Sequence, residues 1–267
     1  MEARIDGRFV PANGLDMYVR EQGNGAPLLL LHGGSADGSE WEPVVPFLAE
    51  RFRVIRPDSR GHGRTANPSG FLSYGTMTDD VAALIEALAL DAPVVCGWSD
   101  GGQVALDLAI RYPHLVRALA VGGVRFRQTP EYIQQIKDVL CVEPGGVNIA
   151  RFARFNPDWV ARMDATQSHR GDPRAWETLI HSIAYLWLSP FGLDETNLAS
   201  ISAPTLLIAA DGDLLAPPEE ALAMYRLVPN AVLSVFPASD HSLPWTRPDA
   251  FAGLVGSFLS SEVRIPA

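Results

Sequence analysis

The chain has 267 residues, of which 47% are hydrophobic, and its formal net charge is −10. This length fits one large α/β domain or two small ones, and the composition is sufficient for a buried core. An acidic chain without clustered Lys and Arg argues against nucleic acid or an anionic membrane as a partner. We therefore expect the partner to be a small molecule.

The two cysteines, Cys96 and Cys141, are too few for a disulfide framework and match no metal site, so no metal is expected. The first ten residues show no basic region followed by an apolar stretch, which argues against a signal peptide. No apolar run approaches the length of a membrane span. We expect a cytoplasmic protein without membrane association; the oligomeric state stays open, a homodimer being one option.

Short apolar runs alternate with helical patterns along most of the chain. The first half predicts strands at 17–22, 26–34, from 52 into a Gly-rich loop, 92–97 and 116–123, with helices at 76–90 and 100–113. The C-terminal part predicts strands at 204–213 and 231–237, with helices at 217–228 and 247–261. Continuous apolar runs such as 26–34 are typical of strands buried on both faces of a sheet.

Residues 124–198 interrupt this alternation, because they contain no clear short strand and show helical spacing at 175–188. Alternating strands and helices predict a mostly parallel sheet with helices on both faces, formed by residues 1–123 and 199–267. The intervening residues are predicted to form a helical cap at the sheet's carboxyl edge. We expect most aromatic side chains of the cap to form its core and two or three to face a pocket.

A serine between two glycines follows the strand predicted at 92–97. The residues Gly97-Trp98-Ser99-Asp100-Gly101 fit the pattern G-x-S-x-G, with a buried strand before and a helix after. A sharp strand-to-helix turn strains its corner residue and requires small neighbours. The helix that follows offers free backbone N–H groups and the positive end of its dipole. Ser99 is therefore the candidate nucleophile.

A serine nucleophile needs a base, and the base needs an orienting acid. His241 lies between the last predicted strand and the last helix, in a loop that faces the same edge as Ser99. His32 and His62 are weaker alternatives, and the three remaining histidines, His114, His169 and His181, are expected to be structural or solvated.

Two acids, Asp211 and Asp213, follow the strand predicted at 204–213. Both fit the position of the orienting acid at its end, although either could simply form a turn or cap. Their position relative to the strand leaves both open.

The sequence resembles the α/β-hydrolase family over nearly its whole length. The resemblance is carried by His32-Gly33-Gly34-Ser35, PDSRGHGRT at 57–65, the Ser99 segment, Asp213 with Pro217, and His241 with Pro248. The order Ser, Asp, His and the spacing of 28 positions from Asp213 to His241 are typical of the family, and the D-x-x-x-P phrase favours Asp213 over Asp211. Asp240, where many relatives have glycine, departs from the pattern.

The resemblance implies an oxyanion hole formed by backbone N–H groups of Gly34 and Asp100, with Ser35 close by. It also implies that Asp58 and Arg60 brace the floor of the site. Haloalkane dehalogenases and epoxide hydrolases of this family use aspartate where Ser99 stands, which argues against both activities.

The implied activity is hydrolysis of carboxylic esters or lactones of small molecules through an acyl-enzyme, without a cofactor. Alternatives are amino-acid esters or amides and the carbon–carbon bonds of ring-cleavage products. A ligand-binding receptor is the least favoured alternative, because the Ser-Asp-His set is complete.

The side chain of Asp100 has two interpretations. It could turn to solvent and cap the helix, which is the favoured one, or it could face the pocket and pair with a substrate cation. GWSDGG resembles the elbow of valacyclovir-hydrolase-like proteins, which act on α-amino-acid esters, and this supports the second. Trp98, Asp100 and Trp187 are the candidate substrate-binding residues.

Overall fold

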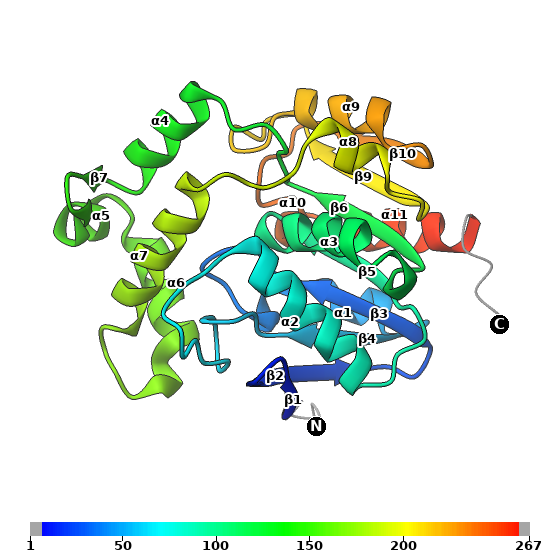
Figure 1. The fold of residues 1–267 in the computed structure, drawn as a ribbon, viewed down its shortest axis with the longest axis horizontal. Coiled ribbons are helices and arrows are strands. Elements are labelled where there is room, and N and C mark those ends of the chain that lie inside the picture. Colours follow the sequence, from blue (N-terminus) through cyan, green and yellow to red (C-terminus); the bar gives the residue numbers. More distant parts are fainter. Residues whose placement is uncertain (1–6, 262–267) are drawn as a thin grey trace.

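A single sheet runs through the protein in the computed structural model, which describes residues 7–261 (Figure 1). Within these residues its eight strands have the order β1-β2-β4-β3-β5-β6-β9-β10. Pairs β1–β2 and β2–β4 are antiparallel and the other pairs are parallel. The strands are β1 (Arg8–Ala12), β2 (Leu15–Gln22), β3 (Ala26–Leu31), β4 (Phe52–Pro57), β5 (Val94–Trp98), β6 (Ala118–Gly122), β9 (Thr205–Ala210) and β10 (Ala231–Phe236).

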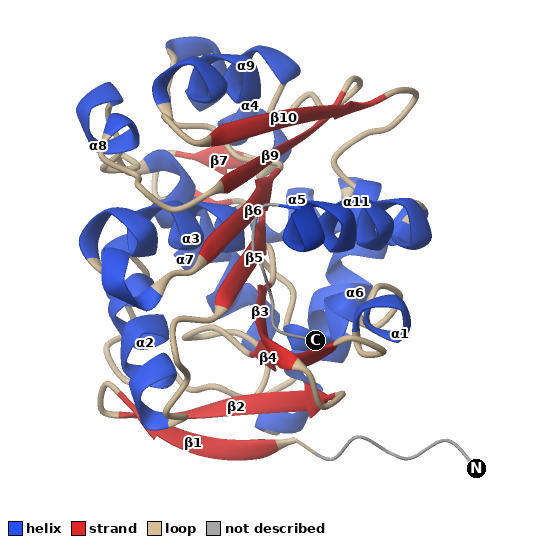
Figure 2. Cartoon of the chain, turned by 90° about the vertical axis from the view of Figure 1, so that its right-hand side faces the viewer, coloured by secondary structure: helices blue, strands red, loops and turns tan. Residues whose placement is uncertain are grey.

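Helices cover both faces of this sheet (Figure 2). One face carries α2 (Tyr74–Ala87), α3 (Asp100–Arg111), α8 (Glu195–Ala199) and α9 (Pro218–Leu227). The other face carries α1 (Val45–Leu48) and α11 (Pro248–Ser261), with α10 (Leu243–Thr246) packed against α11. Because side chains alternate along a strand, Leu29 and Leu31 of β3 enter one hydrophobic core and Leu28 and Leu30 enter the other.

The predicted α/β-hydrolase fold is confirmed, and each strand and helix expected outside residues 124–198 is present. Strand β1 was not predicted. It is short and pairs only with β2 in an antiparallel arrangement at the edge of the sheet. Residues 1–6, part of the segment on which the signal-peptide expectation rests, lie outside the described residues.

The segment 124–198, called the insert below, is mainly helical. It contains α4 (Pro130–Val139), α5 (Ile149–Phe155), α6 (Pro157–Gln167), the 3₁₀ helix η3 (Ser168–Arg170) and α7 (Ala175–Leu188). It also contains a small hairpin, β7 (Val142–Glu143) with β8 (Gly146–Val147), where no strand was expected. In Figure 1 helices α4 to α7 lie together beside the sheet, whereas α8 lies with α9. The division into core and cap stays a prediction.

The aromatic side chains of the insert pack on one another. The ring of Phe152 lies 5.4 Å from that of Trp159 and 6.4 Å from that of Trp176. Trp159 also stacks on Trp187 at 6.2 Å. These ring contacts link α5, α6 and α7, and each contributes stability beyond that of the apolar area it buries.

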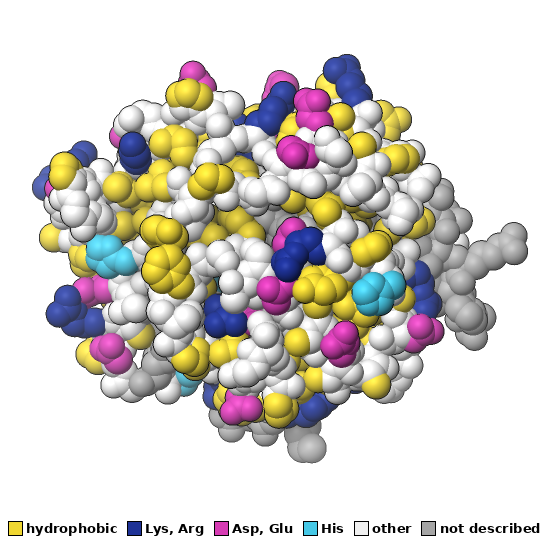
Figure 3. All heavy atoms as spheres, in the orientation of Figure 1, with side chains coloured by type: hydrophobic (Ala, Val, Ile, Leu, Met, Phe, Trp, Pro, Cys, Tyr) yellow, Lys and Arg dark blue, Asp and Glu magenta, His cyan; other side chains and the backbone are white. Residues whose placement is uncertain are grey.

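The surface in Figure 3 mixes side-chain types. Hydrophobic side chains gather over the region between α4 and α7, while acidic and basic side chains are interspersed over the rest of this face. Within residues 7–261, no helix combines the length and the apolar character needed to cross a membrane.

Candidate active site

Ser99 occupies the turn between β5 and α3 with φ 55° and ψ −122°, a conformation that side chains rarely adopt. Its N–H donates to the carbonyl of Gly122 at 2.9 Å, and its own carbonyl accepts from Gly102 at 2.9 Å and Gln103 at 3.0 Å. A Cβ on Gly97 or Gly101 would overlap the neighbouring backbone. The two glycines of the motif therefore allow the backbone to close around a strained serine.

The loop after β10 brings His241 to Asp213. Nδ1 of His241 lies 2.7 Å from Oδ2 of Asp213. The other carboxylate oxygen of Asp213 accepts backbone N–H groups of Leu215 and Ala216, both at 2.9 Å. Asp213 is only 2% exposed. Because both oxygens of its carboxylate are bound, it holds the imidazole in one orientation. Nε2 is the ring nitrogen left for another partner.

Ser99 and His241 line the same cavity, which has a volume of about 750 Å³. The core contributes residues at strand ends, including Gly33, Gly34 and Gly123. The insert contributes Tyr132 and Ile136 of α4, Trp159 and Arg162 of α6, and Trp187 of α7. The cavity thus lies between the carboxyl edge of the parallel strands and the insert, which is where ligands bind in open α/β sheets.

Gly34, Ser35 and Asp100, the residues expected at the oxyanion hole, all line this cavity. A Cβ on Gly34 would lie 2.5 Å from Oδ2 of Asp100 and 2.8 Å from Cζ2 of Trp187, so no larger residue fits without a shift. Ser35 adopts a positive φ of 64°, and its Oγ accepts the indole N–H of Trp159 at 2.7 Å. The turn after β3 is therefore in contact with the insert.

The carboxylate of Asp100 lies in the cavity wall and not in solvent. Its side chain accepts from the hydroxyl of Tyr74 at 2.8 Å and from Nε1 of Trp187 at 2.9 and 3.0 Å, and Asp100 is 4% exposed. The favoured expectation of a solvated helix cap is wrong, because α7 covers this end of α3. Burial raises the pKa of Asp100, and the hydrogen bonds from Trp187 and Tyr74 oppose that effect.

Comparison with known proteins places the chain in a family. The model of the alpha/beta hydrolase family matches residues 28–254. The chain belongs to this family. The relatives of this alpha/beta hydrolase differ in the substrates named for them.

It is 29% identical to a 2-hydroxy-6-oxo-2,4-heptadienoate hydrolase of Pseudomonas putida, over 96% of this chain and 97% of the relative. It is 28% identical to a pimeloyl-[acyl-carrier protein] methyl ester esterase of Nitrosomonas europaea, over 88% and 96%. The enol-lactonase structure from Burkholderia xenovorans LB400 superposes with a TM-score of 0.74 at 25% identity, over 95% of this chain and 100% of that one.

Not every predicted site residue of this alpha/beta hydrolase reaches the cavity. Trp187 does, whereas Trp98 is fully buried in the core beside Phe251 and is not part of the cavity lining. The indole N–H of Trp98 donates to the carbonyl of His241 at 2.9 Å. Substrate contact by Trp98 is therefore not supported by the structure. Instead, Trp98 holds the loop that carries His241. The prediction failed because successive side chains along a strand point to opposite sides, so Trp98 faces the core while Ser99 faces the cavity.

The weaker candidates lie elsewhere. Asp211 is exposed and accepts the N–H of Ser239 at 3.1 Å, away from the His241 ring. His32 and His62 are buried, and their ring nitrogens contact backbone carbonyls of Gly33 and Arg60. Among the residues the structure describes, no group of three His, Cys, Asp or Glu side chains could hold a metal ion.

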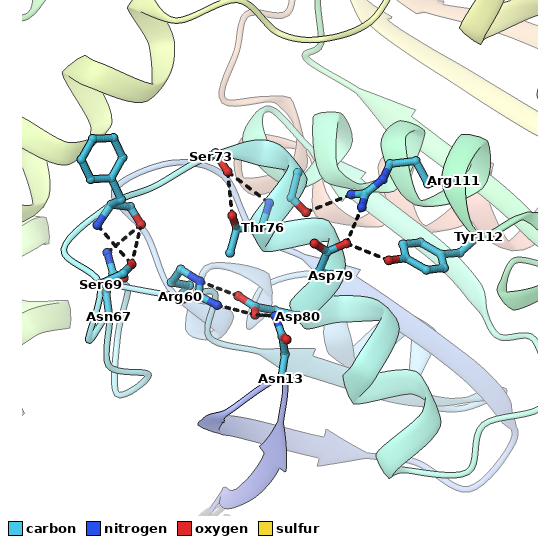
Figure 4. Close-up of polar contacts among 12 residues, drawn as sticks. Asn13, Arg60, Asn67, Ser69, Ser73, Thr76, Asp79, Asp80, Arg111 and Tyr112 are labelled. Atoms are coloured by element: carbon cyan, nitrogen blue, oxygen red, sulfur yellow. Dashed lines mark hydrogen bonds and ion pairs between the residues drawn. The ribbon is translucent and has the colours of Figure 1, made fainter.

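Asp58 and Arg60 form buried contacts beneath the loops. Arg60 binds both oxygens of Asp80 at 2.6 and 2.8 Å (Figure 4). Asp58 accepts from Arg20 at 2.7 Å and from the N–H of Gly38 at 2.9 Å. These pairs join β2, the loop after β4 and α2, which is consistent with the bracing role expected for them.

Tyr74 and Glu40 are among the polar cavity residues that sequence reasoning missed. Tyr74 begins α2 and reaches Asp100 from a helix distant in the sequence. Glu40 lies in the 3₁₀ helix η1 (Gly38–Trp41), and its Oε2 accepts the N–H of Gly33 at 2.8 Å. Neither residue belongs to a motif, so only the three-dimensional contacts reveal them.

Proposed function

We propose that this alpha/beta hydrolase cleaves carboxylic esters or lactones of small molecules, with Ser99 as nucleophile, His241 as base and Asp213 as the orienting acid. The observation that carries the proposal is the 2.7 Å contact between Asp213 and Nδ1 of His241, on a ring that shares its cavity with the strained Ser99. This contact leaves Nε2 of His241 to take the serine proton.

The reaction follows from these positions. Ser99 Oγ attacks the substrate carbonyl while His241 accepts its proton, and the backbone N–H groups of Gly34 and Asp100 stabilise the resulting oxyanion. His241 then gives the proton to the alcohol oxygen as the C–O bond breaks, which leaves an acyl-serine. The alcohol departs from an ester and stays on the acyl chain of a lactone. Water attacks this acyl group by the same route and frees Ser99. Asp213 stabilises the imidazolium that forms twice in the cycle.

The Asp100 carboxylate favours an ester or lactone over an anionic substrate. It lies in the cavity wall directly after Ser99, while the rest of the lining includes Asp37 and two arginines, Arg125 and Arg162. A 2-hydroxy-6-oxo-dienoate has no ester bond, so its hydrolysis breaks a carbon–carbon bond, and it brings a carboxylate into this cavity. Like charges in a cavity of low dielectric repel strongly. Carbon–carbon hydrolysis is therefore the less favoured alternative.

A second candidate is hydrolysis of esters that carry an amino group. The observation in its favour is that the Asp100 carboxylate lies in the cavity wall directly after Ser99. Two donors already bind this carboxylate, yet a carboxylate offers about four acceptor sites, which leaves room for an ammonium group. The two candidates share one mechanism and differ in the substrate's acyl group.

The test is a panel of substrates measured with wild type, Ser99→Ala and the matched exposed variant Ser69→Ala. The panel contains p-nitrophenyl acetate, butyrate and octanoate, a neutral lactone, an amino-acid ester and a 2-hydroxy-6-oxo-dienoate. We expect turnover of an ester or lactone that Ser99→Ala abolishes and Ser69→Ala retains. Turnover of the dienoate alone would reassign the reaction to carbon–carbon hydrolysis. Full activity of Ser99→Ala would contradict the proposal.

A further inference from the structure

Glu40 is a cavity acid that the mechanism above does not use. Its Oε2 accepts the N–H of Gly33 at 2.8 Å, and a Cβ on Gly33 would lie 3.4 Å from Cβ of Ser99 and 3.6 Å from Oε2 of Glu40. Glu40 therefore binds the turn after β3 at Gly33, the residue of this turn that lies beside Ser99.

The other polar group of Gly33 is also held. Nδ1 of His32 lies 2.7 Å from the carbonyl of Gly33, and Nε2 of His32 accepts the N–H of Ser59 at 2.9 Å. Because Nε2 must be an acceptor, Nδ1 carries the proton and donates to Gly33. The tautomer of His32 is thus determined by its two backbone neighbours.

This arrangement controls the direction of the Gly34 N–H. The carbonyl of Gly33 and the N–H of Gly34 belong to one trans peptide, in which they point in opposite directions. While His32 holds the carbonyl on one side, the N–H is directed to the other. Glu40 holds the preceding N–H, so both polar groups of Gly33 are bound.

Without such contacts the turn would be free to adopt other backbone conformations. Gly33 and Gly34 are consecutive glycines, and glycine has the widest choice of backbone conformations. An oxyanion donor must stay within about 0.5 Å of its productive position to be effective. A turn of two glycines therefore needs external contacts to hold an N–H group in place.

We propose that Glu40 is a positioning residue that holds the Gly33–Gly34 turn so that the Gly34 N–H faces the oxyanion. This inference rests on the proposed function, because it assigns Gly34 the role of oxyanion donor. Glu40 acts through Gly33 and does not itself take part in bond making.

The charges around Glu40 agree with this role. It faces Asp37 from its own loop, Asp100 from α3 and Arg162 from α6. Burial, supported by the two aspartates and opposed by the Gly33 N–H and Arg162, raises the pKa of Glu40 to about 8. Near pH 7 Glu40 is therefore mostly protonated and still accepts from Gly33 through its carbonyl oxygen. Above pH 8 its ionisation places a negative charge near the developing oxyanion, which opposes the reaction.

The test compares Glu40→Ala, Glu40→Gln and the control Glu42→Ala, an exposed acid two residues along the chain. Steady-state kcat and KM are measured on the panel substrate that wild type turns over, from pH 6 to about 9.5, with Tm as the check on folding. Gln keeps the acceptor for Gly33 but cannot ionise, whereas Ala removes the acceptor.

In Glu40→Ala we expect kcat to fall about 10- to 100-fold with KM changed by less than about threefold, because the lost contact matters mainly in the transition state. Glu40→Gln restores most of kcat at pH 7 and lacks the decline in kcat that wild type shows above about pH 8. Glu42→Ala retains the wild-type profile.

Two results would overturn the inference: wild-type kcat in Glu40→Ala, or an effect confined to KM. If Glu40→Ala fails to fold, Glu40→Met, which keeps the length of the side chain but has no oxygen acceptor for Gly33, takes its place. Failure here is distinct from failure of the proposed function, because Ser99→Ala then still abolishes turnover.

Discussion

Trp187 donates its indole N–H to both carboxylate oxygens of Asp100, at 2.9 and 3.0 Å. One residue comes from the insert and the other directly follows Ser99, so a single contact joins α7 to the start of α3. The insert is therefore hydrogen-bonded to the turn that carries the nucleophile, and we expect a change in one to affect the other.

Trp187→Phe keeps a large aromatic ring and removes this donor. Leaving a buried carboxylate with fewer partners costs about 1–3 kcal/mol, so we expect a lower free energy of unfolding and a lower kcat/KM. Urea unfolding and steady-state kinetics measure both. Trp176→Phe, in the same helix and without a contact to Asp100, is the control. Equal stability of the two variants would show that the indole N–H contributes nothing.

Asp213→Asn keeps the shape of the side chain and removes the charge that orients His241. We expect kcat to fall by about 10⁴-fold while the protein stays folded, because the imidazole loses its useful tautomer. Asp211→Asn, two residues earlier and exposed, should remain close to wild type. A large loss in Asp211→Asn instead would show that the wrong acid has been assigned.

Gly34→Ala tests the space at the oxyanion turn. Its Cβ would meet Asp100 Oδ2 at 2.5 Å and Trp187 at 2.8 Å, which forces the turn away from its position. Displacing one oxyanion donor lowers kcat by about 10²- to 10³-fold. Gly253→Ala, in α11 with no atom within 4 Å of the added carbon, controls for the substitution itself. An unchanged kcat in Gly34→Ala would remove Gly34 from the mechanism.

Asp100→Asn separates the two substrate candidates. Asn can still accept hydrogen bonds from Tyr74 and Trp187, and its backbone N–H is unchanged. If the carboxylate binds a substrate ammonium, kcat/KM should fall about 10- to 100-fold more for an amino-acid ester than for a neutral ester, because a charged hydrogen bond is lost. Parallel losses on both esters would argue against the amino-group candidate.

The raised pKa of Glu40 also predicts how stability depends on pH. Between pH 4.5, the ordinary pKa of a glutamate, and about pH 8, Glu40 is protonated in the folded protein and ionised in the unfolded chain. This group therefore lowers the free energy of unfolding as pH rises through that window, and has no further effect above it.

Glu40→Gln cannot ionise, so its Tm should exceed that of wild type at pH 8 and approach it at pH 4.5. Each kcal/mol corresponds to roughly 2 °C in a chain of this size. Glu42→Gln is the exposed control. A Tm difference that does not change with pH would contradict the assignment of the raised pKa to Glu40.

The sequence alone determined the fold class and the residues around Ser99, because both depend on local patterns. Continuous apolar runs specify buried parallel strands, and a serine flanked by glycines between strand and helix specifies the strained turn. His241 could be found because it follows a strand, and the carboxyl ends of parallel strands meet at one edge. The same argument left Asp211 and Asp213 open, and the resemblance to the family favoured Asp213.

Only the tertiary structure decided which side chains surround Ser99, Asp213 and His241. Trp98 lies in the motif yet points into the core, and Asp100 faces the cavity because Trp187, 87 residues away, covers it. Glu40 belongs to no motif and is defined by its contact with Gly33. Long-range packing sets the direction and burial of a side chain, and therefore its pKa. Sequence periodicity gives only the face of an element, which is why these roles could not be predicted from it.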